Sequence, residues 1–340
     1  MRDILDTVGQ WVDEDRPVAL ATVVETWGSA PRGVGSKMAV TPDLSMIGSV
    51  SGGCVENAVI EEALAGLEDH RPRLLKFGVA DDTAWEVGLT CGGRISVYTE
   101  PLDRQWWRIT SESTRTDTPV TTVTILEGDR AGQKIVVDET GAVRYQTSDL
   151  PGEVVEALQQ AAREHRTSTW TTAAGYEVMV DVMQARPHLI MIGGVHVAMP
   201  LSVYANQLGF RVSIVDPRAA FATEARFPDV TTILHSYPDK ALPQLGLTND
   251  TYLAVLTHDP KIDDPALIAA LTADVPYVGV LSSSRTHEKR VARLKAAGLT
   301  DEQLARIRTP IGIDIGANTP EEIALCIMAE IVGVRNGVLA

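Results

Sequence analysis

The clearest fold signal in this chain is the run Leu189-Ile190-Met191-Ile192-Gly193-Gly194-Val195-His196-Val197-Ala198. Four consecutive apolar residues suit a short strand that is buried on both faces, as in a parallel sheet covered by helices. Two glycines then allow a tight turn, and a helical stretch follows. This order of strand, glycine turn and helix is typical of the start of a doubly wound α/β domain.

Similar apolar runs recur along the C-terminal half, with helical stretches between them. They are Val212-Ser213-Ile214-Val215, Leu253-Ala254-Val255-Leu256 and Tyr277-Val278-Gly279-Val280-Leu281. The alternation predicts a Rossmann-like parallel sheet over residues 186–340. Thr319-Pro320-Glu321-Glu322 predicts the start of the last helix, because it combines a capping box with proline at the first helical position. Cys326 lies on the apolar stripe of that helix and is predicted to be a core residue.

The glycine turn makes Gly193, Gly194 and His196 candidates for binding a nucleotide-like ligand. Val195 stands where the G-x-G-x-x-G/A pattern has its second glycine, which lets a pyrophosphate approach the backbone. Asp216 ends the next strand about 20 residues further on, at the position of a ribose-binding acid. Arg218 follows it and is an alternative partner for a 2′-phosphate.

Other candidates follow later strands, because ligands in such folds bind at the carboxyl ends of the strands. His258 is a candidate proton carrier near neutral pH, and its alternative interpretation is a loop or helix-capping histidine. Asp259 beside it, Ser283 after the next strand and Asp314 in a glycine-bracketed loop are candidate cofactor contacts.

Residues 1–105 are predicted to form a separate α+β domain, and residues 106–185 a connecting subdomain. Strand-like stretches in the first range are 18–24, 37–40, 73–77 and 95–98. In the second range, 121–126 and 134–137 predict a hairpin, 153–163 a helix and 176–183 a strand.

The N-terminal range contains the segment Gly48-Ser49-Val50-Ser51-Gly52-Gly53-Cys54-Val55-Glu56-Asn57, followed by a helical pattern. Gly52 and Gly53 permit a tight turn and close approach of a ligand. Cys54 would then lie near a helix N-terminus, where the dipole favours anions and lowers a thiol pKa. The alternative is a turn with a small buried apolar side chain.

Two other features of this range could take part in the same chemistry. Cys91 also lies among glycines, and if it lies beside Cys54 the pair could bind a soft metal or relay sulfur. Arg32 and Lys37, in a loop rich in small residues, could hold a phosphate, or the loop could be an ordinary turn.

Composition excludes several functional classes. The chain has 45 Asp and Glu against 30 Lys and Arg, a net charge of −15, which argues against a nucleic-acid or anionic-membrane partner. Three widely spaced cysteines make no disulfide framework or zinc knuckle. The N-terminus lacks an apolar signal core, and no apolar run reaches the roughly 18 residues of a membrane span. These features predict a cytoplasmic protein, and base rates favour a homodimer.

Taken together, the motifs resemble the XdhC/CoxI family, accessory proteins of xanthine dehydrogenase and related molybdenum hydroxylases. The N-terminal match comprises Gly28-Ser29-Ala30-Pro31-Arg32, Ser51-Gly52-Gly53-Cys54-Val55-Glu56 and Gly88-Leu89-Thr90-Cys91-Gly92-Gly93. The C-terminal match comprises Gly193, His196-Val197-Ala198, Asp216, Thr257-His258-Asp259, Ser283 and Pro310-Ile311-Gly312-Ile313-Asp314-Ile315-Gly316. Val195, Ser51 and Ser282 depart from the family pattern, since glycine is common at all three positions.

The resemblance implies a carrier of molybdenum cofactor, the molybdopterin-bound metal. Such a protein would protect the cofactor, assist exchange of an oxo for a sulfido ligand, and deliver the cofactor to an apo molybdenum hydroxylase of the xanthine dehydrogenase type. A cysteine desulfurase would supply the sulfur. Cys54 or Cys91 would contact molybdenum or carry sulfur, and Arg32 and Lys37 would hold phosphate. The alternatives are an NAD(P)-dependent oxidoreductase and a non-catalytic adaptor, so the chain is expected to be a maturation factor more than a turnover enzyme.

Overall fold

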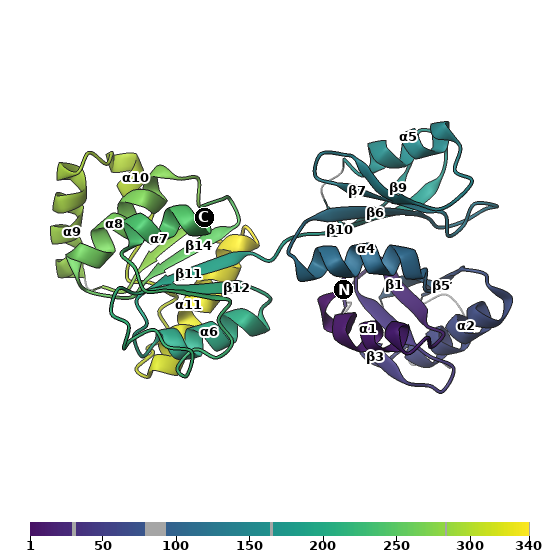
Figure 1. The fold of residues 1–340 in the computed structure, drawn as a ribbon, viewed down its shortest axis with the longest axis horizontal. Coiled ribbons are helices and arrows are strands. Elements are labelled where there is room, and N and C mark those ends of the chain that lie inside the picture. Colours follow the sequence, from purple (N-terminus) through teal and green to yellow (C-terminus); the bar gives the residue numbers. More distant parts are fainter. Residues whose placement is uncertain (29–31, 79–92, 164–165, 283, 340) are drawn as a thin grey trace. The chain divides into compact units, whose positions relative to one another are not determined.

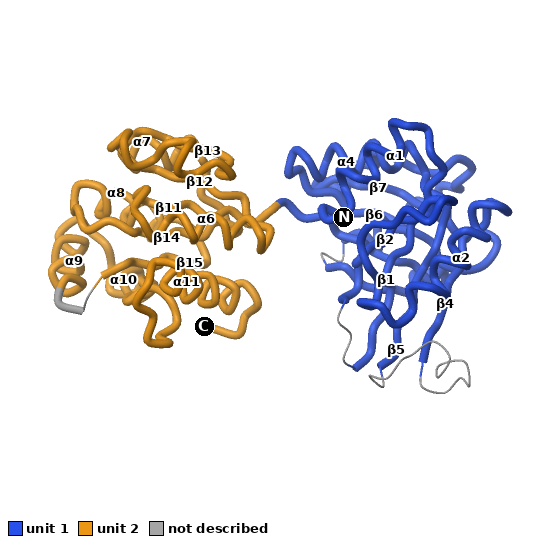
Figure 2. The backbone as a smooth tube through the Cα atoms, turned by 90° about the horizontal axis from the view of Figure 1, so that it is seen from below, with its two compact units in different colours: residues 1–185 blue, residues 186–340 orange. Residues whose placement is uncertain are grey.

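The computed structural model describes residues 1–340 except 29–31, 79–92, 164–165, 283 and 340. The chain forms two compact units, unit 1 (Met1–Ala185) and unit 2 (Arg186–Ala340), shown in different colours in Figure 2. The predicted ranges 1–105 and 106–185 both fall within unit 1, and each contains one of its two sheets.

Unit 1 contains two antiparallel five-stranded sheets. Sheet A has the spatial order β3 (Met46–Gly48), β2 (Lys37–Val40), β1 (Ala19–Trp27), β5 (Arg94–Pro101) and β4 (Arg73–Phe77). Sheet B has the order β8 (Val143–Gln146), β7 (Lys134–Asp138), β6 (Val120–Ile125), β10 (Glu177–Met183) and β9 (Ser168–Thr171). The helical elements are η1 (Arg2–Ile4), α1 (Leu5–Asp13), α2 (Glu56–Asp69), α4 (Arg104–Arg115) and α5 (Gly152–Ala161).

The period-2 alternation of the strands divides unit 1 into layers. Ala21 and Val23 of β1 pack with Val59 of α2 on one face of sheet A. Leu20, next to Ala21 in sequence, packs on the other face with Trp106 of α4, in a core that also holds residues of sheet B. Helix α5 covers the outer face of sheet B (Figure 1). The two sheets therefore face each other across a shared interior.

Unit 2 is a six-stranded parallel sheet covered by helices on both faces. Its spatial order is β13 (Thr232–Leu234), β12 (Arg211–Val215), β11 (His188–Ile192), β14 (Thr251–Val255), β15 (Tyr277–Val280) and β16 (Ile307–Arg308). The helices are α6 (Ala198–Gln207), α7 (Pro238–Leu245), α8 (Pro260–Thr272), α9 (Ser284–Ala296), α10 (Asp301–Ala305) and α11 (Pro320–Arg335).

This strand order is the doubly wound Rossmann order, with its switch point between β11 and β14. Leu189 and Met191 pack in the cluster that contains α6 and α11, whereas Ile190 and Ile192 pack in the cluster that contains α7 and α8. The predicted fold class and the burial of this strand on both faces are confirmed. The capping box of Thr319 is also confirmed, and Cys326 is buried in the core.

Candidate functional site

A pocket of about 550 Å³ lies at the carboxyl edge of the parallel sheet in unit 2, and we call it the carboxyl-edge pocket. The loops after β11, β12, β14 and β15 form it, at the place where doubly wound folds bind ligands. Its lining residues are Val195, His196, Val197, Arg218, Leu256, Thr257, His258, Asp259, Leu281 and Pro320. The pocket combines an apolar wall with a few polar groups, as small-molecule sites commonly do.

The two glycines of the turn allow close packing of the chain on itself. A Cβ on Gly193, whose φ is +104°, would lie 2.3 Å from Cγ2 of Thr257. A Cβ on Gly194 would lie 2.6 Å from the carbonyl oxygen of Phe221. The loop after β12 thus sits against the glycine turn, which accounts for both glycines through packing alone.

Asp216 is fully buried, and its carboxylate is occupied by groups of the chain. It accepts hydrogen bonds from the backbone N–H of Gly194 at 2.9 Å and of Arg218 at 2.9 Å. The Arg218 side chain donates from Nε at 2.9 Å and from Nη2 at 2.8 Å. Burial opposes ionisation, but the bonds from Arg218 and Gly194 outweigh it and lower the pKa of Asp216. Asp216 therefore positions the turn and Arg218.

The other predicted residues of unit 2 differ in their placement. His196 and His258 are exposed and line the carboxyl-edge pocket. Asp259 also lines it and caps α8 by accepting from the backbone N–H of Lys261 at 2.9 Å. Asp314 is exposed in the loop before α11, does not line this pocket, and accepts from Gly316 N–H. Ser283 lies outside the described residues.

A buried ion pair supports the wall of the pocket at Thr257. The Thr257 hydroxyl donates to Oδ1 of Asp263, and Nη2 of Arg290 lies 3.1 Å from Oδ2 of the same carboxylate. The side chains of Asp263 and Arg290 are each only 1% exposed. Burial raises the pKa of Asp263 even though Thr257 and Arg290 stabilise its ionised form.

In unit 1, the glycine turn before α2 is occupied by the chain's own carboxylate. Gly52 and Gly53 have φ angles of 82° and 119°, which glycine adopts without strain. Glu56 accepts from the backbone N–H groups of Ser51 at 2.9 Å, Gly52 at 2.9 Å and Gly53 at 2.8 Å. Cys54 is half-buried beside this network, and its N–H donates to the Ser51 hydroxyl at 3.0 Å. The N–H groups that could have held an external anion thus bind Glu56.

We expect Glu56→Gln to lower the free energy of unfolding of unit 1 by about 2–3 kcal/mol at neutral pH, because an amide nitrogen replaces an acceptor of several hydrogen bonds. Burial would raise the pKa of Glu56, but bonds from Ser51 and Ser49 outweigh it and lower the pKa to about 2. A lowered folded-state pKa stabilises the fold above the ordinary value of 4.5, and this contribution is lost as pH falls toward 2.

Urea unfolding followed by tryptophan fluorescence checks this, since all six tryptophans lie within residues 1–185. The deficit of Glu56→Gln should shrink from pH 7 to about pH 3. Glu61→Gln is the matched control, because Glu61 is exposed on the same helix. Equal stability of both variants at pH 7 would contradict the assigned role of Glu56.

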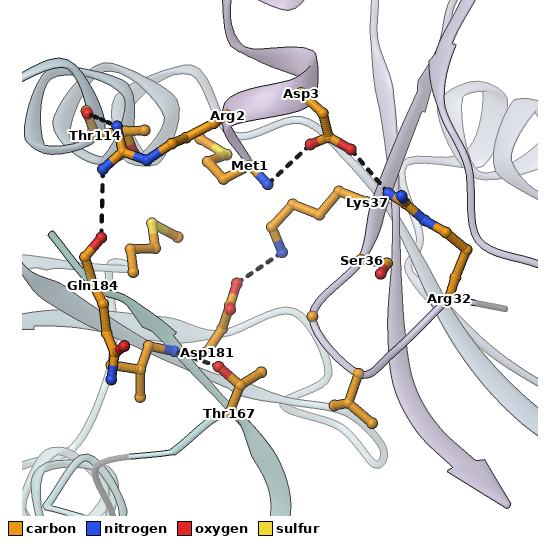
Figure 3. A pocket seen from close by; sticks show the side chains of 14 residues that line it. Met1, Arg2, Asp3, Arg32, Ser36, Lys37, Thr114, Thr167, Asp181 and Gln184 are labelled. Atoms are coloured by element: carbon orange, nitrogen blue, oxygen red, sulfur yellow. Dashed lines mark hydrogen bonds and ion pairs between the residues drawn. The ribbon is translucent and has the colours of Figure 1, made fainter. Parts of the chain in front are cut away.

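Arg32 and Lys37 line one pocket of about 470 Å³ in unit 1 (Figure 3). Nη2 of Arg32 lies 2.8 Å from Asp3, and its Nε donates to the Ser49 carbonyl at 3.0 Å. Nζ of Lys37 lies 2.7 Å from Asp181 of β10, and the Lys37 side chain is 3% exposed. The structure therefore brings the two cations to one cavity, with each already paired to a carboxylate.

Two predicted features cannot be located in the structure. Cys91 lies outside the described residues, so its distance from Cys54 is not defined. Within the described ranges, no group of three or more His, Cys, Asp and Glu side chains is arranged to hold a metal ion. Over the same residues, no helix is both long and apolar enough to cross a membrane.

Several residues that organise these sites were not singled out by the sequence analysis. Asp181 interrupts an apolar strand, which is a recognisable signal for a paired buried charge. Glu56 follows a glycine turn at the first position of a helix, where an acid satisfies free N–H groups. Arg290 lies in a charged helix and carries no local signal of burial.

Two family models match separate parts of the chain. The model described as the XdhC Rossmann domain matches residues 189–331, and the model described as the XdhC and CoxI family matches residues 11–78. One match therefore falls within each unit.

Relatives match along nearly the whole chain. The molybdenum cofactor insertion chaperone PaoD of Escherichia coli (strain K12) is 28% identical over 335 residues, covering 98% of this chain and 88% of PaoD. A Bacillus subtilis (strain 168) protein, whose name describes a probable xanthine dehydrogenase subunit, is 26% identical and covers 96% of both chains. The uncharacterized protein YqeB of E. coli (strain K12) is 26% identical over 95% of this chain, which spans only 44% of the length of YqeB.

The fold is also similar to that of a solved structure. A crystal structure described as a xanthine dehydrogenase from Bacillus halodurans aligns with a TM-score of 0.81 and 23% identity. The alignment covers 98% of this chain and 96% of that one. Both units of this fold therefore occur together in another protein.

Proposed function

Since this chain belongs to the XdhC/CoxI family, we propose that it binds molybdenum cofactor, assists its sulfuration and delivers it to an apo hydroxylase of the xanthine dehydrogenase type. The observation that carries the proposal is the match to PaoD, a molybdenum cofactor insertion chaperone, over 98% of this chain. The cofactor is cargo in this function, and a cysteine desulfurase is the proposed sulfur donor.

The carboxyl-edge pocket supports the proposal by its chemistry. Val195, Leu256 and Leu281 offer apolar contacts to a flat heterocycle, and Arg218 offers hydrogen-bond donors to a phosphate. Molybdopterin carries both groups. A pocket of about 550 Å³ is within the size range of small-molecule sites.

Cys54 is the proposed thiol contact to the metal centre, since thiolates are ligands of soft metals. Gly52, Gly53 and Glu56 hold its backbone in a fixed turn, and its side chain is only partly buried. A thiol on a rigid turn is pre-organised for contact with cargo, whereas Cys326 is enclosed in the core of unit 2.

The test is anaerobic incubation of the full chain with molybdenum cofactor released from a donor enzyme. After ultrafiltration, retained molybdenum and pterin are measured for wild type, Cys54→Ser and the control Cys326→Ser. We expect stoichiometric retention by wild type and Cys326→Ser, and at least about tenfold weaker retention by Cys54→Ser if a charge-assisted contact is lost.

Two other results would redirect the proposal. Retention unaffected by Cys54→Ser would keep the carrier function and remove Cys54 from the site. Absence of retention by wild type, together with binding to an apo hydroxylase, would favour an adaptor that carries no cofactor.

A further inference from the structure

We infer that Arg218 is the anchor of a phosphate-binding site in the carboxyl-edge pocket, specific for ligands with a terminal phosphate monoester, and that Asp216 contacts no ribose there. The inference goes beyond the proposed function, because it concerns any phosphorylated ligand of this pocket. It applies to the cofactor cargo only where the proposed function holds.

Asp216 is not available to a ligand. Its side chain has 0% exposure, and both oxygens already accept hydrogen bonds from Gly194 and Arg218. A ribose diol would have to displace these donors from a buried carboxylate, which costs more than the new bonds return. The position that recognises the ribose of a dinucleotide in many Rossmann folds thus serves internal packing here.

Arg218 is held with one edge of its guanidinium facing the pocket. Nε and Nη2 are fixed by Asp216 at 2.9 and 2.8 Å. The Phe221 ring lies against the guanidinium, 3.9 Å from its carbon to the ring centroid. Nη1 has no hydrogen-bond partner among the described residues, and the side chain is 39% exposed. The remaining N–H donors form a pre-organised edge for bidentate contact with a phosphate.

The neighbours of Arg218 in the pocket define its charge. His196 and His258 can add positive charge when protonated, whereas Asp259 opposes an anion. The place at the end of β12 is where this fold accommodates a phosphate beside an arginine. A dianionic phosphate gains more from the fixed guanidinium than a single carboxylate does.

The experiment measures binding to the full chain by calorimetry with inorganic phosphate, NADP⁺ and NAD⁺ as probes. NADP⁺ and NAD⁺ differ only in the 2′-phosphate, so they test a nucleotide as the phosphate source. Wild type should bind phosphate, and it should bind NADP⁺ about ten- to a hundredfold tighter than NAD⁺ if the nucleotide fits.

Arg218→Met should weaken phosphate binding about ten- to a hundredfold, and Arg218→Lys should restore part of it. Because Arg218→Met leaves a buried carboxylate unpaired, the double variant Asp216→Asn/Arg218→Met provides a version without that charge. Asp259→Asn is the matched control, since asparagine still caps α8 and removal of the negative charge should tighten binding. Thermal unfolding without ligand verifies that each variant is folded.

The same variants distinguish the inference from the proposed function. Loss of cofactor retention in Arg218→Met, with phosphate binding lost in parallel, supports both. Arg218-dependent phosphate binding with unchanged cofactor retention supports the inference and places the cargo elsewhere. Absence of phosphate binding by wild type, or phosphate binding by folded Arg218 variants equal to wild type, would overturn the inference whether or not the cofactor is retained.

Discussion

Replacing Asp181 with asparagine is expected to lower the free energy of unfolding of unit 1 by about 3–5 kcal/mol, because it leaves the Lys37 ammonium buried without its counter-charge. Lys37 belongs to sheet A and Asp181 to sheet B, so their 2.7 Å pair links the two layers. A second buried pair, Lys134 with Glu100 at 2.6 Å, links the sheets in the opposite sense. Both pairs lie in the shared interior of unit 1, where each lysine side chain is 3% exposed.

Urea unfolding followed by tryptophan fluorescence reports on unit 1 and measures this loss. The double variant Lys37→Met/Asp181→Leu should recover most of the stability, since an apolar pair of similar size removes both buried charges. Arg144→Gln is the control, because the Arg144–Asp138 pair belongs to the same sheet but Arg144 is 61% exposed. That variant should change stability by less than about 1 kcal/mol. A comparably small effect of Asp181→Asn would mean that the Lys37 ammonium reaches water.

Replacing Arg290 with methionine is expected to destabilise unit 2 by about 3–5 kcal/mol near neutral pH, because Asp263 then remains ionised and unpaired in the core. Asp263 also accepts from Thr257, which lines the carboxyl-edge pocket. The variant should therefore weaken ligand binding as well as stability. Arg293→Met is the control on the same helix, since its pair with Asp264 at 2.6 Å is more exposed.

The pH dependence of this variant has a definite sign. Burial already raises the pKa of Asp263 above its ordinary value, and loss of the Arg290 charge raises it further. For an acid whose folded-state pKa is raised, stability is greatest at low pH and is lost as pH rises through that pKa. The deficit of Arg290→Met should be smaller at pH 5 than at pH 8.

Urea unfolding followed by circular dichroism checks the Arg290 prediction, with tryptophan fluorescence identifying the transition of unit 1. A deficit independent of pH would indicate lost packing and not an unpaired carboxylate. Equal deficits in Arg290→Met and Arg293→Met would contradict the importance of burial for the Asp263 pair.

Local sequence patterns predicted much of the secondary structure. The predicted strands 37–40 and 73–77 agree with β2 and β4 at both ends. Helix α4 was not predicted, although Asp103 caps it, because its sequence is polar and its two buried tryptophans do not follow a conspicuous apolar pattern. Trp106 and Trp107 are buried by sheets that meet only in the folded unit. Their role depends on residues distant in sequence.

The sequence alone was sufficient to determine the parallel sheet of unit 2, its glycine turn and the capped last helix. Strand period, turn residues and helix caps depend on neighbours along the chain, so they can be recognised without a structure. Only the tertiary structure decided the roles of the charged side chains. Lys37 meets Asp181, and Arg218 is held by Asp216 and Phe221, because a buried charge takes the partner that chain topology brings within a few ångströms.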